Sequence, residues 1–290
     1  MKIHRIETGK VRIKKNQISR RKGLAPQMLK VIFGKKWADW VPIYAWVIEH
    51  PEGIIVVDTG ETSRTGQQGY LPKWHPYYAF AVAFDVKPEN EIGAQLLQLG
   101  IDPSKDVKKV IMTHMHTDHA GGLHHFRNSE IIIDKKEYKA ASGVPGILAG
   151  YLPHRWPKWL NPTLITLPHD PYFSFSKSMA VTADRKVMIV STPGHVVNHL
   201  SVIVEIDDLY YFLAGDTSYT EQNLLKLIPD GIGTSQSLKT LKNILSFSES
   251  NATIYLPSHD PHNADRMDNR KIVSVTKKPK HVKKLQEILN

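Results

Sequence analysis

Residues 113–122 read Thr-His-Met-His-Thr-Asp-His-Ala-Gly-Gly, and the interpretation of the whole chain begins from them. The stretch follows directly after residues 107–112, a short run that predicts a buried strand. Four side chains of metal-binding type therefore stand in a tight loop at the end of a rigid element: His114, His116, Asp118 and His119. Their spacing lets them diverge toward two adjacent metal ions. A solvated histidine-rich turn is the alternative, but it gathers neutral imidazoles without a purpose.

Three more residues of the same type follow predicted strands farther along the chain. His195 ends the stretch Ser-Thr-Pro-Gly-His, Asp216 ends Ala-Gly-Asp, and His259 lies in Pro-Ser-His-Asp. Because strand ends can deliver distant residues to one sheet edge, we expect these side chains to join the first four. Five histidines and two aspartates form a set that can hold two divalent ions.

The composition narrows the chemistry of the site. The chain has no cysteine, which excludes disulfides, thiolate zinc sites, iron-sulfur clusters and a cysteine nucleophile. Any metal must therefore bind to His, Asp or Glu. Imidazole with carboxylate favours Zn²⁺, and Co, Fe or Mn also fit such a ligand set.

The net charge of +10 over 290 residues raises the question of a polyanionic partner. Residues 1–36 carry 12 Lys and Arg against one Glu, and residues 270–290 carry 7 against one. The rest of the chain is mildly acidic, with 19 basic and 26 acidic side chains. We therefore expect one domain over residues 1–290 with basic segments 1–36 and 270–290 as extensions, and no nucleic-acid partner.

The sequence also gives expectations about the compartment. No apolar run approaches the roughly 18 residues that a membrane-spanning helix needs, so no membrane partner is expected. The basic N-terminus lacks the apolar stretch of a secretory signal. The expected location is therefore the cytoplasm.

Strands and helices are expected to interleave in both halves of the chain, which predicts an α/β protein with two packed sheets and helices outside them. Residues 142–172 contain six Pro and two Trp, and we expect an irregular segment that covers a pocket. Strands are predicted at 10–14, 42–48, 53–57, 107–112, 131–133, 187–191, 200–205, 210–214 and 253–256, and helices at 88–99, 135–141 and 236–246.

The seven ligand-type residues resemble the full ligand series of the metallo-β-lactamase superfamily in its two-metal hydrolase form, over about residues 40 to 262. The resemblance implies a four-layer αββα sandwich with the metal site at one sheet edge. It also implies a distribution of ligands: His114, His116 and His195 on one metal, Asp118, His119 and His259 on the other, and Asp216 bridging both.

Within that superfamily the chain is most similar to the N-acyl homoserine lactone lactonases, which quench bacterial quorum signals. The likeness lies in Asp-Thr-Gly at 58–60, the Gly-Gly after the motif, His-Asp at 259–260 and Asp-Thr-Ser-Tyr at 216–219. It implies attack of a metal-bridging hydroxide on the lactone carbonyl, with the Tyr219 phenol at the substrate carbonyl or ring oxygen. Asp118 would shuttle a proton to the leaving alkoxide.

Further residues have weaker assignments. Asp58 and Asp260 are candidates for orienting a ligand histidine, with turn or loop capping as the alternative for each. His124 and His125 are expected to be ordinary loop histidines, and His199 a structural hydrogen-bonding residue. Thr117 departs from the bulky residue that lactonases often have there, and the acyl pocket is expected to involve Thr117, Phe126, Leu148, Tyr151, Trp156 and Trp159.

Other functions compete with lactone hydrolysis. A phosphodiesterase or nuclease of the RNase Z type shares the histidine series, but the acidic body of the chain disfavours it. A glyoxalase II-like thioester hydrolase normally needs a longer region after His259, and β-lactamases generally lack an aspartate at position 216. A non-catalytic scaffold would usually have lost ligands. Leu29, Phe33 and Trp37 are candidates for a homodimer contact.

Overall fold

A computed structural model describes residues 1–20 and 26–274, and the chain divides into two compact units. Unit 1 is Met1–Thr166 with Asp230–Ile232, and unit 2 is Leu167–Pro229 with Gly233–Asn290. Each unit contains one β-sheet. The expectation of a single domain over residues 1–290 stays a prediction.

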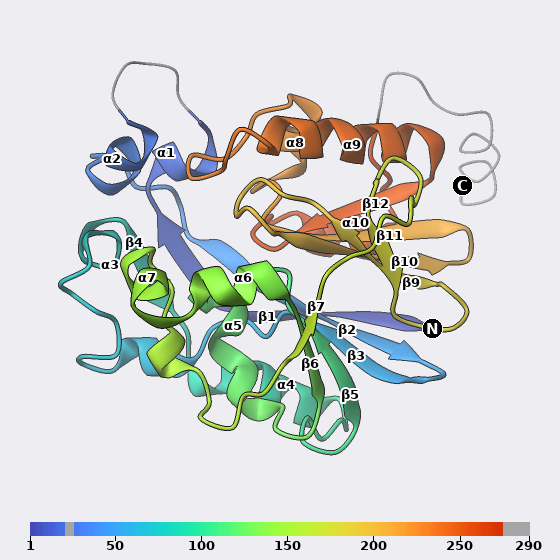
Figure 1. Ribbon diagram of the computed structural model, residues 1–290, viewed down its shortest axis with the longest axis horizontal. Coiled ribbons are helices and arrows are strands. Elements are labelled where there is room, and N and C mark those ends of the chain that lie inside the picture. Colours follow the sequence, from blue (N-terminus) through green and yellow to red (C-terminus); the bar gives the residue numbers. More distant parts are fainter. Residues whose placement is uncertain (21–25, 275–290) are drawn as a thin grey trace. The chain divides into compact units, whose positions relative to one another are not determined.

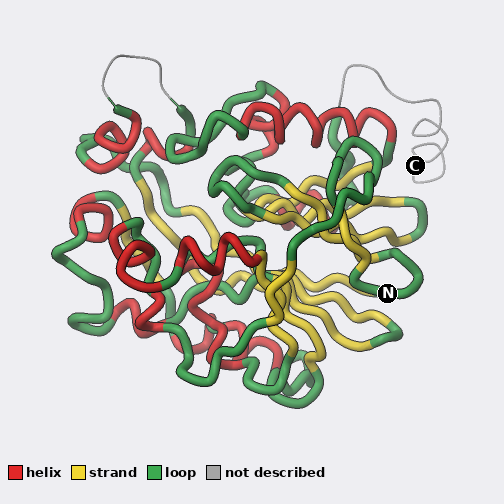
Figure 2. The backbone as a smooth tube through the Cα atoms, viewed as in Figure 1, coloured by secondary structure: helices red, strands yellow, loops and turns green. Residues whose placement is uncertain are grey.

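Unit 1 is built on a seven-stranded sheet in the order β4-β1-β2-β3-β5-β6-β7 (Figure 1). Strands β1 to β4 pair antiparallel, and β3, β5, β6 and β7 run parallel to one another. The strands twist across the sheet (Figure 2). Their bounds are β1 Lys2–Ile13, β2 Val41–His50, β3 Gly53–Val57, β4 Val82–Asp85, β5 Val107–Ile111, β6 Glu130–Asp134 and β7 Thr163–Ile165.

β2 is an interior strand of this sheet, and most of its side chains are buried, Ile43 to Ile48 among them. Its neighbour β1 is an interior strand that pairs with β2 on one side and β4 on the other. The expectation that residues 1–36 form an extension is therefore wrong for Lys2–Ile13. Buried Ile6, Val11 and Ile13 hold this basic strand in the sheet, while its charged residues lie more exposed.

Short helices connect the strands of unit 1. Residues 88–99, predicted as one helix, form the 3₁₀ turn η2 and the helix α4, whose buried Ile92 and Leu96 face the core. The helices are α1 Lys15–Ile18, α2 Gln27–Ile32, α3 Pro76–Phe80, α4 Ile92–Gln98, α5 Thr117–Ala120, α6 Lys135–Ala141 and α7 Gly143–Leu148. The 3₁₀ turns are η1 Ser63–Gly66, η2 Pro88–Asn90, η3 Gly121–His125 and η4 Pro153–Arg155.

Unit 2 is built on a five-stranded sheet in the order β12-β11-β10-β9-β8. The strands are β8 Ser178–Ala180, β9 Val187–Ser191, β10 Leu200–Ile206, β11 Leu209–Gly215 and β12 Thr253–Pro257, and the helices are α8 Glu221–Leu225, α9 Ser237–Ser250 and α10 Asn263–Asp268. The helix α9 lies along the sheet (Figure 1), and its Leu241, Ile244 and Phe247 pack with Phe212 and Tyr255 of the strands. This apolar cluster is the core of the unit.

The sequence predicts a particular character for each of the segments 142–172 and 270–290. Residues 142–172, predicted to be irregular, include α7, η4 and the edge strand β7. Of the basic C-terminal segment, residues 275–290 lie outside the described residues. Within residues 1–20 and 26–274, no helix has both the length and the apolar character that crossing a bilayer requires.

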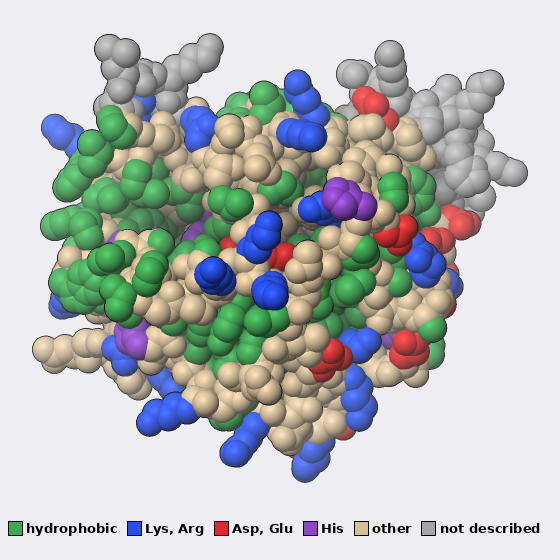
Figure 3. Space-filling view, in the orientation of Figure 1, with side chains coloured by type: hydrophobic (Ala, Val, Ile, Leu, Met, Phe, Trp, Pro, Cys, Tyr) green, Lys and Arg blue, Asp and Glu red, His purple; other side chains and the backbone are tan. Residues whose placement is uncertain are grey.

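Exposed apolar side chains gather on one face of unit 1, over α2, α3 and α7 (Figure 3). The rings of Phe33 and Phe80 lie 6.2 Å apart between centroids. Trp37, in contrast, is half-buried and lies under the ammonium group of Lys14, 3.7 Å from the ring centroid. The exposed members of this face are Met28, Leu29, Phe33, Trp74, Phe80, Val144 and Leu148.

Candidate metal centre

The motif of unit 1 is positioned by two parallel strands. Val57 at the end of β3 pairs with Ile111 at the end of β5, so the residues that follow these strands emerge side by side. The backbone N–H of Asp58 donates to the carbonyl of Ile111 at 2.9 Å. Asp58 takes a positive φ of 58°, which turns the chain sharply beside the motif.

The carboxylate of Asp58 holds the motif from behind. Its Oδ1 accepts the backbone N–H of Thr113 at 2.8 Å. Its Oδ2 accepts the Thr113 hydroxyl at 2.8 Å and lies 2.8 Å from Nδ1 of His119. When Nδ1 of His119 donates its hydrogen to Asp58, the lone pair of Nε2 is left to bind a metal. Asp58 thus makes the contact that its predicted role requires.

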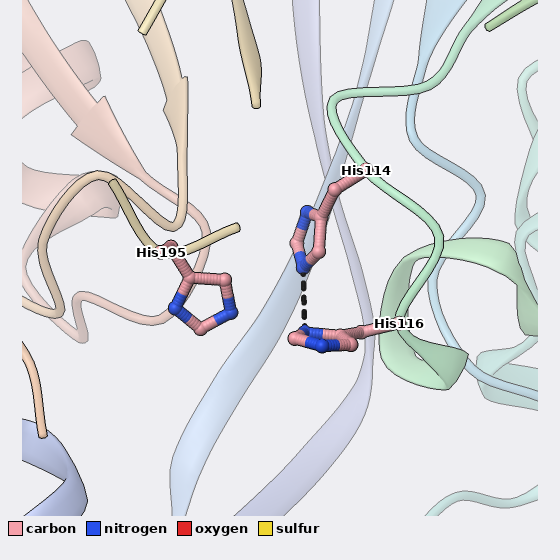
Figure 4. Close-up of side chains that lie close together, drawn as sticks. All are labelled: His114, His116 and His195. Atoms are coloured by element: carbon pink, nitrogen blue, oxygen red, sulfur yellow. Dashed lines mark hydrogen bonds between the residues drawn. The ribbon is translucent and has the colours of Figure 1, made fainter. Parts of the chain in front are cut away.

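The imidazoles of the motif form a compact cluster within unit 1. Figure 4 shows His114 and His116 joined by a hydrogen bond, with 2.9 Å between Nε2 of His114 and Nδ1 of His116. The ring of His114 also lies 4.1 Å from that of His119, between centroids. His114 and His119 are fully buried. Burying several imidazoles together is typical of metal ligands, because each nitrogen lone pair needs a proton or a cation facing it.

A buried carboxyl that the sequence analysis missed lies behind this cluster. Glu61 is fully buried, and burial raises its pKa to about 8, with the charge of Asp118 adding to the effect. Gly121 makes room for it, because a Cβ at that position would lie 2.3 Å from the Glu61 Oε1. A Cβ at Gly122 would meet the carbonyl of Thr59 at 2.3 Å. The Gly-Gly pair is thus required by the close approach of residues 59–62.

In unit 2, three strands point the other ligand-type residues toward one edge of the sheet. β10 runs antiparallel to both β9 and β11, and β12 runs parallel to β11, so β9, β11 and β12 end on the same side. Gly215 pairs with Pro257, which brings the following residues Asp216 and His259 close together. The strand ends therefore assemble the second group of predicted residues.

Asp216 lies between two histidines. Its Oδ2 is 3.4 Å from Nε2 of His195, and its Oδ1 is 3.3 Å from Nε2 of His259. All three side chains are nearly fully buried. Each oxygen of this carboxylate faces a different imidazole, which is the arrangement expected of a carboxylate that bridges two metal ions.

His199 has a structural contact in this unit. Its Nε2 accepts the backbone N–H of Asp216 at 3.1 Å, and its Nδ1 faces the Thr192 hydroxyl at 2.9 Å. One ring nitrogen therefore holds the backbone of Asp216, and the other contacts the residue that follows β9. This arrangement matches the structural interpretation that the sequence favoured for His199.

Tyr219 and Asp260 lie near the same edge but differ in their contacts. The Tyr219 ring stacks on His259, with 5.5 Å between centroids and a 25° angle. The Asp260 carboxylate accepts the backbone N–H groups of Glu221 and His262 and pairs with Arg266. These contacts correspond to the capping interpretation of Asp260.

The residues proposed for the acyl pocket are spread over unit 1. The ring of Tyr151 lies 5.0 Å from that of His116, and its hydroxyl donates to Glu137 at 3.1 Å.

Phe126 is completely buried in the core, whereas Leu148 is 65% exposed. Trp156 stacks on Tyr138, with 5.5 Å between centroids, and Trp159 is half-buried. Thr117 begins α5, between His116 and Asp118. Tyr151 and Thr117 are thus the members beside the motif.

Both residue groups offer the nitrogen and oxygen atoms that divalent transition metals bind. Unit 1 gathers three imidazoles with Asp118, and unit 2 places a carboxylate between two imidazoles. His119 is oriented through Nδ1 by a buried carboxylate, which is the usual outer contact of a metal-binding histidine. The residues therefore fit divalent metal ions, with nitrogen and oxygen ligands suited to zinc.

Comparison with known families gives one match over most of the chain. The model described as the metallo-beta-lactamase superfamily matches residues 38–259. An N-acyl homoserine lactonase AttM of Azorhizobium caulinodans is 28% identical over 237 residues, covering 76% of this chain and 82% of that protein. An N-acyl homoserine lactonase AiiA of Bacillus thuringiensis subsp. kurstaki is 27% identical over 223 residues, with the same coverage.

Solved structures resemble the chain in fold. An N-acyl homoserine lactone hydrolase with the product N-hexanoyl-L-homoserine at its catalytic metal centre has a TM-score of 0.68 and 21% identity, covering 91% of this chain and 94% of that one. The dizinc quorum-quenching lactonase AidC has a TM-score of 0.60 and 16% identity, covering 89% and 87%. The mixed α/β architecture with two sheets agrees with these neighbours, as the sequence predicted.

Replacement of Asp58 tests how the motif is held. Asp58→Asn keeps the size of the side chain but removes the charge that faces His119, so metal affinity should fall by about 10- to 100-fold. Metal content after dialysis against a graded series of chelator concentrations measures the change. Asp39→Asn, at an exposed position of the same unit, is the control. Equal metal retention by Asp58→Asn and the wild type would contradict the orienting role.

Proposed function

The chain belongs to the metallo-beta-lactamase superfamily, and we propose that it opens the lactone ring of N-acyl homoserine lactones with two divalent metal ions. The observation that carries the proposal is the buried carboxylate of Asp216 between His195 and His259. It accompanies the complete histidine motif at 113–122. The named lactonase relatives support the substrate class.

The proposed metal ligands follow the superfamily's ligand series. His114, His116 and His195 would hold one ion, Asp118, His119 and His259 the other, and Asp216 both. When bound, two such ions lower the pKa of water and polarise an ester carbonyl, which is what hydrolysis of a lactone by hydroxide requires. We propose zinc for both ions, since imidazole and carboxylate are its common ligands.

The protein's own groups have distinct proposed tasks. Asp58 fixes the ring of His119 through Nδ1, and His199 fixes the backbone of Asp216. Tyr219, stacked on His259, would donate its phenolic hydrogen to the oxygen that becomes negative when the carbonyl is attacked. Asp118 would accept a proton and deliver it to the leaving alkoxide.

Expectations about assembly and location stay predictions. The exposed apolar face over α2, α3 and α7 includes Leu29 and Phe33, and it supports the proposal of a homodimer contact there. The ring of Trp37 makes cation–π contacts with Lys14 and Arg12 within its own unit. The acidic body of the chain supports a neutral substrate rather than a nucleic acid, and a cytoplasmic location is proposed.

A substrate panel tests the proposed reaction. The metal-loaded protein should hydrolyse short- and long-chain acyl homoserine lactones, followed by proton release in a pH-stat. Bis-p-nitrophenyl phosphate and S-lactoylglutathione, measured in parallel, represent the phosphodiesterase and thioesterase alternatives. We expect kcat/KM for lactones to exceed both by orders of magnitude. Phosphodiester turnover that greatly exceeds lactone turnover would overturn the proposal.

Removal of one hydroxyl tests the role of Tyr219. Tyr219→Phe keeps the ring stacked on His259 but removes the donor, so kcat/KM for lactones should fall about tenfold, or roughly 1–2 kcal/mol of transition-state stabilisation. Tyr211→Phe, on a strand of the same unit, is the matched control. Unchanged lactone kinetics in Tyr219→Phe, with metal content preserved, would remove this residue from the mechanism.

A further inference from the structure

A second cluster of metal-binding side chains lies in unit 1 and shares no residue with the seven ligands already described. It consists of Glu91, His124 and His125, whose ligand atoms all lie within 4.8 Å of one another. Glu91 precedes α4, and the two histidines end η3. The local sequence predicts ordinary loop histidines at both positions, and Glu91 is more than 30 positions away along the chain.

The three ligand atoms converge on one point. Oε2 of Glu91 lies 3.1 Å from Nε2 of His124 and 2.8 Å from Nε2 of His125. In a tetrahedral zinc site with bonds of 2.0–2.1 Å, neighbouring ligand atoms are about 3.3 Å apart. Both separations from Glu91 are therefore within about half an ångström of the tetrahedral value, and the ligand atoms of the two histidines lie within 4.8 Å of each other.

The hydrogen bonding of His124 favours a cation at this point. Its Nδ1 lies 3.1 Å from the carbonyl oxygen of Gly121, and a carbonyl can only accept, so Nδ1 carries the hydrogen. In the neutral ring, Nε2 then holds a lone pair that faces the carboxylate oxygen of Glu91. Two lone pairs at 3.1 Å repel each other unless a metal ion or a second ring proton lies between them. A backbone carbonyl on the other ring nitrogen is also the usual outer contact of a metal-binding histidine.

The surroundings hold the cluster in this geometry. The other carboxylate oxygen of Glu91, Oε1, accepts hydrogen bonds from the Ser63 N–H at 2.9 Å, the Ser63 hydroxyl at 2.5 Å and the Thr62 hydroxyl at 3.2 Å. These contacts direct Oε2 toward the histidines. Gly93 makes room for the His125 ring, because a Cβ there would lie 2.3 Å from Nδ1.

Solvent can reach the cluster. The side chains of His124 and His125 keep 24% and 23% of their surface exposed, whereas Glu91 keeps 10%. An ion here would have three protein ligands and water in the fourth position. Two histidines with one glutamate is a ligand set that zinc sites use.

We propose that Glu91, His124 and His125 form an additional binding site for a single divalent transition-metal ion, with zinc as the best fit. The ion ties Glu91, before α4, to the end of η3, and Glu91 is in turn held by Thr62 and Ser63 through its other carboxylate oxygen. Binding of the ion to the folded state therefore stabilises unit 1.

Metal stoichiometry tests the proposal. Tag-free protein is stripped with chelator, titrated with Zn²⁺ or Co²⁺ by calorimetry, and analysed by elemental mass spectrometry. The wild type should bind three ions, and His124→Gln and His125→Gln should each bind two. His154→Gln, which changes an exposed histidine of the same unit, should still bind three. Glutamine can donate to Glu91, so both variants are expected to fold, and circular dichroism checks this.

The outcomes separate the additional site from the main centre. With Co²⁺, the wild type should show a visible absorption component that is absent from His124→Gln and His125→Gln, while both variants retain lactone hydrolysis. Folded variants that bind as many ions as the wild type would overturn the proposal, whatever the total number of ions. In that case the second ring proton of His124 accounts for its contact with Glu91.

Discussion

The buried carboxylate of Asp58 is the interaction on which the arrangement of unit 1 depends. It is 1% exposed, and burying a charged carboxylate is costly unless donors satisfy it. Thr113 and His119 supply those donors from the residues that follow the parallel neighbour strand. The carboxylate thereby ties the end of β3 to both ends of the histidine motif. Its position at the strand end, with a positive φ, makes this reach possible.

Unit 2 also contains a buried carboxylate beside histidines, that of Asp216. Asp216 also follows a strand and is buried, but its oxygens face His195 and His259 at 3.3–3.4 Å, longer than ordinary hydrogen bonds. Its backbone, rather than its side chain, is held by His199. One unit thus contains a carboxylate that orients a histidine, and the other contains a carboxylate that faces two histidines, where we propose a metal ligand. The proposed reaction requires both.

The sequence predicted most of the strands and all seven candidate ligands, because their signals are local. Apolar runs marked β2, β3 and β5, and dense histidine spacing marked residues 113–122. Short edge strands such as β4 and β8 carry too few residues for a periodic signal. The helix α7 was missed because Gly143, Pro145 and Gly146 are typical of loops.

The buried acidic groups could not be predicted from the sequence for a different reason. Glu61 and Glu91 resemble ordinary surface glutamates in the sequence, and only tertiary contacts remove them from solvent. Glu61 meets the Gly-Gly pair of the motif, and Glu91 meets two histidines more than 30 residues away. Such pairings depend on how the turns after β3 and α5 pack, which no local pattern encodes. The same limit applies to Asp260, whose partners Glu221 and Arg266 are set by tertiary packing, and to Phe126, which is fully buried.

The proposed lactone hydrolysis requires two adjacent metal ions bound by the seven candidate ligands. A crystal structure of the metal-loaded protein, with anomalous diffraction recorded on both sides of the zinc absorption edge, tests it most directly. The account predicts two adjacent anomalous peaks, coordinated together by His114, His116, Asp118 and His119 and by His195, Asp216 and His259. A single peak among these seven residues, or peaks bound by the residues of only one unit, would contradict it.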